Sequence, residues 1–252
     1  MSLNTVSQSL QRLYRGYRAH AFRRAVSTQP QEGMPSMRVC ADVDCDRGPS
    51  RQSIERLPVC YRTAWAAAGV TRLSALFGRL GSRYAAESDV LGICVDVIWD
   101  CALHSDFNRS WLDSLQIACM DLLVIHSDNL EGGGTSDVEH AISAIACCLE
   151  AAKSGDHEEA LRACSHVRNA LDEESELSMY GDELRIGERH QVEGAYPLVE
   201  LERKRQLRDL LELRLTADRP SPNVIRRLRD RAFAEAAVAP EINGVPILIR
   251  RS

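Results

Sequence analysis

The sequence has no uninterrupted apolar run that approaches the ~20 residues needed to span a bilayer. The first residues also lack the apolar core and small-residue cleavage site of a secretory signal, so we expect a cytoplasmic location and no membrane partner. The nine cysteines are odd in number and scattered, which favours free, reduced thiols over a disulfide framework. What remains is an ordinary globular composition, with 44% hydrophobic and 27% charged residues.

Signatures of common catalytic and metal sites are also missing. No Lys-Ser/Thr pair follows the triple glycine, and no Gly-x-Ser-x-Gly nucleophile motif occurs. The stretch at 42–48 is DVDCDRG and begins like a calcium loop, but Arg47 and Ser53 stand where an EF-hand needs Gly and Glu. Cys40 and Cys45 supply only two of the four ligands of a structural zinc site. We therefore expect no enzyme activity, no metal site and no cofactor.

Acidic residues are absent from one part of the chain, and basic residues are scarce in another. Residues 1–30 contain five arginines and no acid, whereas residues 87–176 contain 19 Asp and Glu against four basic residues, a net charge of −15. An acidic middle repels phosphate, so we expect no nucleic-acid partner. The separation of charge favours a basic protein partner, and a solvated acidic surface is the alternative interpretation.

The apolar residues follow helical spacing through most of the chain, without alternation of strands and helices. This pattern predicts an all-α fold class, a multi-helix bundle with antiparallel helical hairpins. It also predicts an N-terminal basic helix and an extended C-terminal tail. The expected organisation is a basic amphipathic helix at 1–26, a linker at 27–50, a helical domain at 51–216, and a short helix and tail at 217–252.

Local signals predict several helix ends. Ser50 or Ser53 is a candidate N-cap, and Pro58 should break or restart the helix that follows. Gly155 should end an alanine-rich helix and lead by a very short turn into its antiparallel partner. The polar stretch at 175–196 is predicted to be a loop with a short helical turn.

Four segments support a resemblance: IERLP at 54–58, DVIWDCAL at 96–103, EHAISAIACCLEAAKSGDHEEAL at 139–161 and YPLVELERKRQLRDLLE at 196–212. Their order resembles the YjaG-like family of all-helical bacterial proteins, over about residues 51–216. The resemblance implies a helical fold and no particular chemistry. Related helical domains occur among immunity proteins of bacterial polymorphic toxin systems, which implies a non-enzymatic protein that binds and blocks a cognate toxin.

Acidic residues predict where such a partner binds. On the helix expected near residues 110–130, an aspartate stripe lies opposite the apolar face, at ~100° per residue. Like charges on one face repel each other, at a cost of a few tenths of a kcal/mol per close pair, and a docked cationic partner would relieve this repulsion. We therefore predict a partner-binding surface for a basic protein, formed by Asp96, Asp100, Asp106, Asp113, Asp121 and Asp128.

A second hypothesis rests on the segment at 10–24, which reads LQRLYRGYRAHAFRR. It resembles the IQ motif that binds calmodulin-like proteins, and the residues that match are Leu10, Gln11, Arg15 and Gly16. His20 occupies the position of the motif's second basic residue. The alternative function is therefore a calmodulin-binding regulatory protein. A third interpretation is that this basic segment folds onto the acidic region of its own chain or of a second copy.

Overall fold

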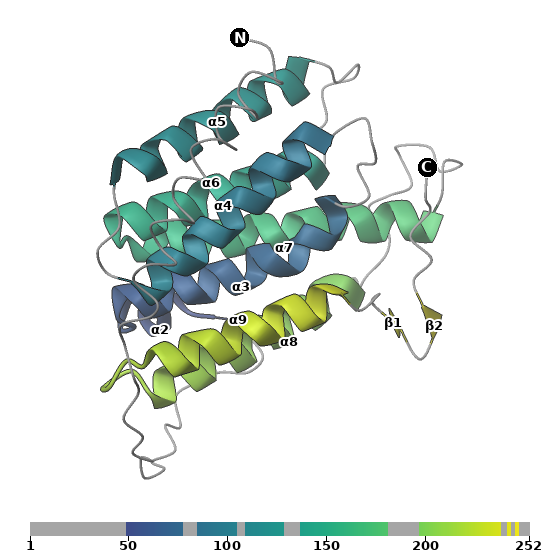
Figure 1. Cartoon of the computed structure of the whole chain (residues 1–252). Coiled ribbons are helices and arrows are strands. Elements are labelled where there is room, and N and C mark those ends of the chain that lie inside the picture. Colours follow the sequence, from purple (N-terminus) through teal and green to yellow (C-terminus); the bar gives the residue numbers. More distant parts are fainter. Residues whose placement is uncertain are drawn as a thin grey trace.

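The computed structural model describes residues 49–77, 85–104, 109–128, 137–180, 197–237, 241–242 and 245–246. These residues form a helical bundle, which confirms the predicted all-α class (Figure 1). The helices are α2 (Arg51–Glu55), α3 (Val59–Phe77), α4 (Ala85–Leu103), α5 (Arg109–Asp128), α6 (Asp137–Ser154), α7 (His157–Tyr180), α8 (Pro197–Leu215) and α9 (Pro222–Ala237). The helix predicted at 1–26 and the linker, up to residue 48, lie outside the described residues.

The start of α2 and the break before α3 fall where the sequence signals predicted. Ser50 is the N-cap of α2, and its hydroxyl accepts a hydrogen bond of 3.2 Å from the backbone N–H of Ser53. Pro58 separates α2 from α3, because its ring cannot continue the hydrogen-bond ladder of a helix. This break lets α3 start in a new direction and run through the middle of the bundle.

The helices α6 and α7 form a tight antiparallel hairpin. Gly155 has a φ of +74° and ends α6, as predicted, since only glycine adopts this left-handed conformation without strain. The helix α7 starts two residues later and continues to Tyr180, so residues 175–180 are helical and not the predicted loop, and the rest of that stretch lies outside the described residues. Good helix formers such as Glu176 and Leu177 favour this extension of the helix.

The bundle is a stack with α5 along one edge and the pair α8 and α9 along the opposite edge (Figure 1). Between them lie α4 and α6, followed by α3 and α7. The helix α3 is central, because it contacts α4, α6, α7, α8 and α9. Its side chains Tyr61, Trp65 and Leu73 are fully buried, and Trp99 of α4 packs in the same core.

The core continues beyond residue 216, where the sequence placed the end of the helical domain. In α9 the apolar residues Val224, Ile225, Leu228 and Ala232 are buried in the core that α3 and α4 share. Beyond α9, the strands β1 (Glu241–Ile242) and β2 (Val245–Pro246) pair in antiparallel register. The described part of the predicted tail therefore consists of two paired strands of two residues each.

Candidate protein-binding surface

The helix α5 is the outermost helix at its edge of the bundle and packs mainly against α6 (Figure 1). Its inner face buries the side chains of Leu112, Leu115, Ala118, Cys119 and Leu122. A helix packed on one side only would ordinarily present polar residues on the other side. The outer face of α5 departs from that pattern.

Three apolar side chains on the outer face of α5 are exposed to solvent. Their exposed fractions are 62% for Ile117, 50% for Met120 and 57% for Val124. The spacing of three and then four residues places them in one row along the helix, because ~3.6 residues make one turn. Single exposed apolar residues are normal, but a contiguous row is typical of a surface that another molecule covers.

Two aspartates lie on the same face as this apolar row. Asp113 is one helical turn before Ile117, and Asp121 is one turn after it. Both side chains are exposed and line a shallow surface hollow of about 450 Å³, together with Gln116, Ile117 and Met120. An apolar strip between carboxylates suits a partner that has apolar side chains flanked by cations.

A lysine of α6 approaches one end of this face. Lys153 Nζ lies 3.2 Å from Asp113 Oδ1 and 2.6 Å from Glu150 Oε2. Hydrogen bonds to Glu150 and to Asp113 raise the pKa of Lys153. Because Asp113 is well exposed, its pairing with Lys153 is a weak surface contact that a better placed cation can replace.

The structure does not bring all the predicted partner-binding aspartates to this face. Asp96 of α4 lies on the side that contacts α9, with its Oδ1 3.4 Å from Arg229 Nη2, and Asp100 follows one turn later on the same side of α4. Asp106 lies outside the described residues, as does the side chain of Asp128. The residues Leu10, Gln11, Arg15, Gly16 and His20 of the IQ-like segment also lie outside the described part of the chain.

The apolar row itself was not predicted from the sequence. The signal was present, since the rotation that groups Asp113 with Asp121 also places Ile117, Met120 and Val124 on the same face. A prediction from charge alone does not include these apolar residues. The described surface is therefore narrower than the predicted acidic stripe and more apolar.

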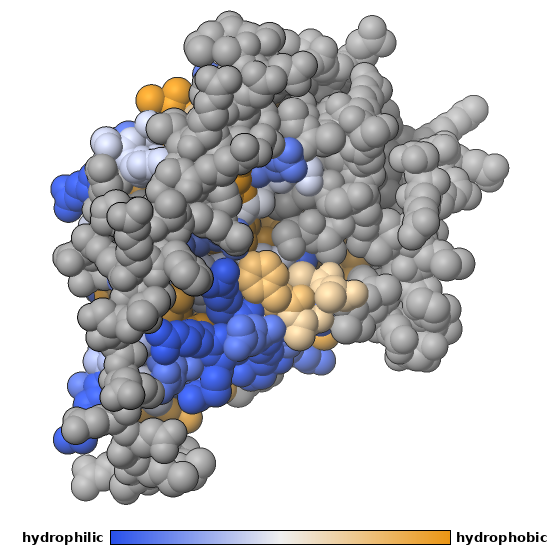
Figure 2. Space-filling model, in the orientation of Figure 1, coloured by the Kyte–Doolittle hydropathy of each residue, from blue (hydrophilic) through white to orange (hydrophobic). Residues whose placement is uncertain are grey.

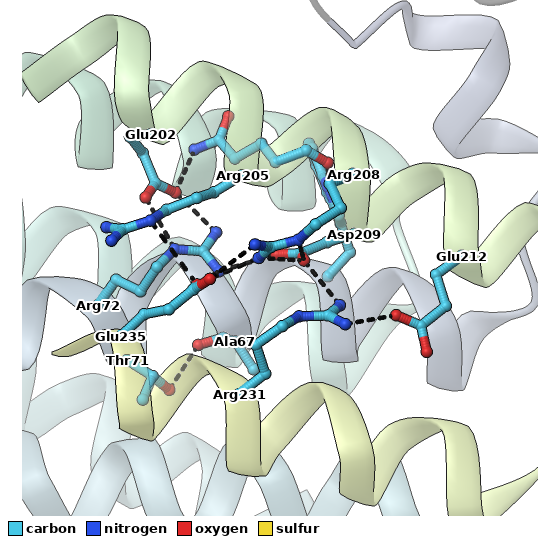
Figure 3. Close-up of polar contacts among 12 residues, drawn as sticks. Ala67, Thr71, Arg72, Glu202, Arg205, Arg208, Asp209, Glu212, Arg231 and Glu235 are labelled. Atoms are coloured by element: carbon cyan, nitrogen blue, oxygen red, sulfur yellow. Dashed lines mark hydrogen bonds and ion pairs between the residues drawn. The ribbon is translucent and has the colours of Figure 1, made fainter. Parts of the chain in front are cut away.

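A cluster of buried charges forms a second unusual site, between α3, α8 and α9 (Figure 3). Arg72 donates to Glu202 through Nε and Nη2, both at 2.7 Å, and its Nη1 donates to Asp209 at 2.8 Å. The exposed fractions of these side chains are only 3%, 1% and 0%. Burial lowers the pKa of Arg72, but the two carboxylates outweigh it and the net shift is upward.

Further arginines surround the carboxylates of this buried cluster. Arg208 and Arg231 donate to Asp209 Oδ1, each at 2.9 Å, and Arg208 also reaches Glu235 of α9 at 2.7 Å. Figure 2 shows hydrophilic residues gathered over this part of the molecule, where α8 and α9 lie in Figure 1. The innermost carboxylates are fully engaged and closed to solvent, so the cluster joins helices rather than offering groups to a substrate.

Two buried tryptophans anchor polar atoms near Arg72. Trp65 Nε1 donates to the backbone carbonyl of Gln206 in α8 at 2.9 Å. Trp99 Nε1 donates to the hydroxyl of Thr71 at 2.8 Å, and that hydroxyl donates to the carbonyl of Ala67. These bonds satisfy polar groups that would otherwise be costly to bury, and they fix α4 and α8 against α3.

A histidine pair connects the helices of the α6–α7 hairpin. The Nδ1 atoms of His140 and His166 are 3.3 Å apart, and both rings are partly buried. Burial and the neighbouring His140 lower the pKa of His166. A hydrogen bond between two imidazole nitrogens requires one of them to be unprotonated, which couples this contact to pH.

The thiols of the described core have raised pKa values, whereas the thiol of a catalytic cysteine has a lowered pKa. Burial raises the pKa of Cys164 to about 12 and that of Cys147 to about 11. The pKa of Cys94 is also raised, first by the contact with Cys119, whose sulfur is 3.8 Å away, and then by burial. Reactive cysteines require a lowered pKa, so these thiols are core residues.

Within the described ranges, no group of three or more His, Cys, Asp or Glu side chains is arranged to hold a metal ion. In that same part of the chain, no helix is long and apolar enough to cross a membrane.

Comparisons with protein-family models, with curated proteins and with solved structures find no match to this chain.

Proposed function

We propose that this chain is a non-enzymatic protein-binding module that docks a basic partner protein on the outer face of α5. The observation that supports this function is the exposed row of Ile117, Met120 and Val124 with Asp113 and Asp121 beside it. The apolar row supplies affinity when it is covered, and the carboxylates accelerate encounter with a cationic surface and orient it.

A toxin domain neutralised by this chain is the kind of basic partner that we favour. The net charge of −15 over residues 87–176 suits a basic enzyme such as a nuclease. The resemblance of the helical segments to YjaG-like proteins, and through them to immunity proteins, points the same way. On this proposal the chain acts by covering the toxin's active surface and performs no chemistry itself.

The experiment measures binding of the purified product of the adjacent gene to the full chain. Charge reversal of Asp113→Lys with Asp121→Lys should raise the Kd at least tenfold, which is about 1.4 kcal/mol. The matched control is Asp218→Lys with Asp230→Lys, two exposed positions of the α8–α9 region, which changes the net charge equally. The control should change the Kd by less than threefold.

A second pair of variants separates the apolar contribution from the charge. Ile117→Ser with Val124→Ser should accelerate dissociation and leave the salt dependence of association unchanged, because apolar contacts act mainly on the dissociation rate. Equal weakening by the α5 and control charge reversals would show that only net charge matters and would contradict the proposal. Failure of the two proteins to form a complex would also contradict it.

The IQ-like spacing of Leu10, Gln11, Arg15 and Gly16 favours a calmodulin-like protein as the alternative partner. In that mode an amphipathic helix enters an apolar groove and its arginines meet acidic residues. A pull-down of the full chain with calmodulin, with and without calcium, distinguishes this alternative from docking on α5.

A further inference from the structure

The outer face of α5 requires a cationic, partly apolar occupant, and the chain itself contains one. Residues 1–26 include five arginines and no acid. The other long segments outside the described ranges, 31–48 and 181–196, each have more acidic than basic residues. Residues 247–252 contain only two arginines. Among these candidates, residues 1–26 complement the α5 face best.

The spacing of side chains in this segment matches the α5 face. Leu10, Leu13, Tyr14 and Tyr17 follow the i, i+3, i+4, i+7 pattern that predicts one apolar face of a helix. At ~100° per residue, Arg12 and Arg15 lie toward the opposite side of such a helix, whereas Arg18 and Arg24 lie nearer the apolar face. On α5, Asp113 and Asp121 are eight residues apart, which is about 12 Å along a helix. The apolar strip can therefore cover Ile117 and Met120 while Arg18 and Arg24 approach the carboxylates.

The tether between this segment and the bundle is long enough for the contact. Residues 27–48 form a link of 22 residues, with a maximum reach of roughly 75 Å. That maximum reach is more than twice the ~30 Å length of a helix of 20 residues such as α5. Such a tether gives an effective concentration near the mM range, so a weak affinity suffices for occupancy.

We propose that the chain's own basic N-terminal segment docks on the outer face of α5 and that an external partner must displace it. The apolar side of the segment covers Ile117, Met120 and Val124, and its arginines pair with Asp113 and Asp121. The displacement by a partner rests on the proposed function, whereas the intramolecular contact does not. The consequence is autoinhibition: the binding face stays covered until a more tightly binding protein competes for it.

The test follows the methyl group of Met120 in the full chain labelled with ¹³C-methyl methionine. The protein has five methionines, and loss of one signal in Met120→Leu assigns that residue. A neutral gadolinium chelate in solution enhances the relaxation of exposed methyl groups. Docking should shield Met120, so the triple variant Arg18→Gln, Arg23→Gln, Arg24→Gln should show at least a twofold larger enhancement than the wild type. Addition of 0.5 M NaCl should produce the same increase by screening.

The matched control replaces three exposed arginines of the described structure, in Arg56→Gln, Arg219→Gln, Arg226→Gln. It removes the same charge and should leave the Met120 signal unchanged. Equal exposure of Met120 in the wild type and the N-terminal variant would overturn the inference. Shielding that disappears on dilution from 400 to 20 µM would also overturn it, because the occupant would then be a second copy. None of these outcomes depends on an external partner, so failure of the proposed function is detected separately.

Discussion

At the scale of single residues, the buried Arg72 links three helices of the bundle. Its guanidinium joins α3 to Glu202 and Asp209 of α8, and it approaches Glu235 of α9 at 3.5 Å. Taking such charges out of water costs several kcal/mol each, and only close pairing offsets that cost. Removal of one partner therefore harms stability more than the pair as a whole contributes.

The first prediction is the effect on stability of removing Arg72 from this cluster. Arg72→Met should lower the free energy of unfolding by about 3–5 kcal/mol, because Glu202 then stays buried without the cation that pairs with it, while Asp209 keeps Arg208 and Arg231. Arg51→Met is the control, since the Arg51–Glu158 pair is exposed by 70% and 36% and should change stability by less than ~1 kcal/mol. Urea denaturation followed by circular dichroism measures both.

Partial rescue provides the internal check on Arg72. Adding Glu202→Gln to Arg72→Met removes the unpaired carboxylate and should recover part of the lost stability. If Arg72→Met proved as mild as Arg51→Met, the cluster would not contribute to stability in the way its geometry indicates.

At the scale of elements, the α6–α7 hairpin depends on how α6 ends. A β-carbon at Gly155 would lie 3.0 Å from Val59 Cγ2, at a backbone φ of +74°. Gly155→Ala should therefore destabilise the protein by roughly 1–2 kcal/mol, through backbone strain and crowding against α3. The measurement is the shift of the thermal unfolding midpoint.

A second glycine in the bundle is the control for this prediction. Gly92 lies within α4, is exposed, and a β-carbon there meets no atom within 4 Å. Gly92→Ala should raise stability by about 0.5–1 kcal/mol, because alanine has the higher helix propensity. The same chemical change should thus have opposite signs at the two sites, and equal signs would contradict the assigned backbone conformation of Gly155.

The histidine pair makes the same hairpin sensitive to acid. Burial lowers the pKa of His166 below its ordinary value of 6.5, so below that pH the unfolded chain binds more protons than the folded one. Stability should stay level above about pH 6.5 and fall as the pH decreases below it. In His166→Gln this fall between pH 7 and pH 5 should shrink, whereas His104→Gln, at an exposed position, should keep the wild-type slope. Urea midpoints at each pH report the difference.

At the scale of the whole molecule, the two edges of the stack differ in charge. Helix α5 has three acidic residues and one basic residue, whereas residues 197–237 have ten basic and seven acidic residues. A basic partner that approaches is therefore attracted toward α5 and repelled from α8 and α9. This difference in charge between the two edges supports α5 as the docking face.

The sequence predicted the parts of this fold that depend on local signals. Helix positions, the Ser50 cap and the Gly155 end follow from residues only a few positions apart, and they are confirmed. The Arg72 cluster could not be predicted in this way, because its partners are 130 and 137 residues distant in the chain. The available signal was an arginine within the apolar second half of α3, and it does not indicate which residue it pairs with.

Only part of the candidate site could be predicted, again because the sequence shows which residues share a helix face but not how helices pack. Helical rotation groups Asp113 and Asp121 correctly, since both lie on one helix. Whether Asp96 belongs with them depends on how α4 is rotated against α9, which is a tertiary property. The binding role of all these residues stays a prediction.

The distance along the chain between Arg72 and its partners has a consequence for synthesis. Ribosomes add ~5–20 residues each second, so α3 emerges roughly 7–26 s before the carboxylates of α8 exist. During that interval Arg72 has no carboxylate of α8 to pair with, and burying an unpaired charge is costly, so its side chain is expected to stay in water. The last step of packing α3 therefore has to wait until α8 has been translated.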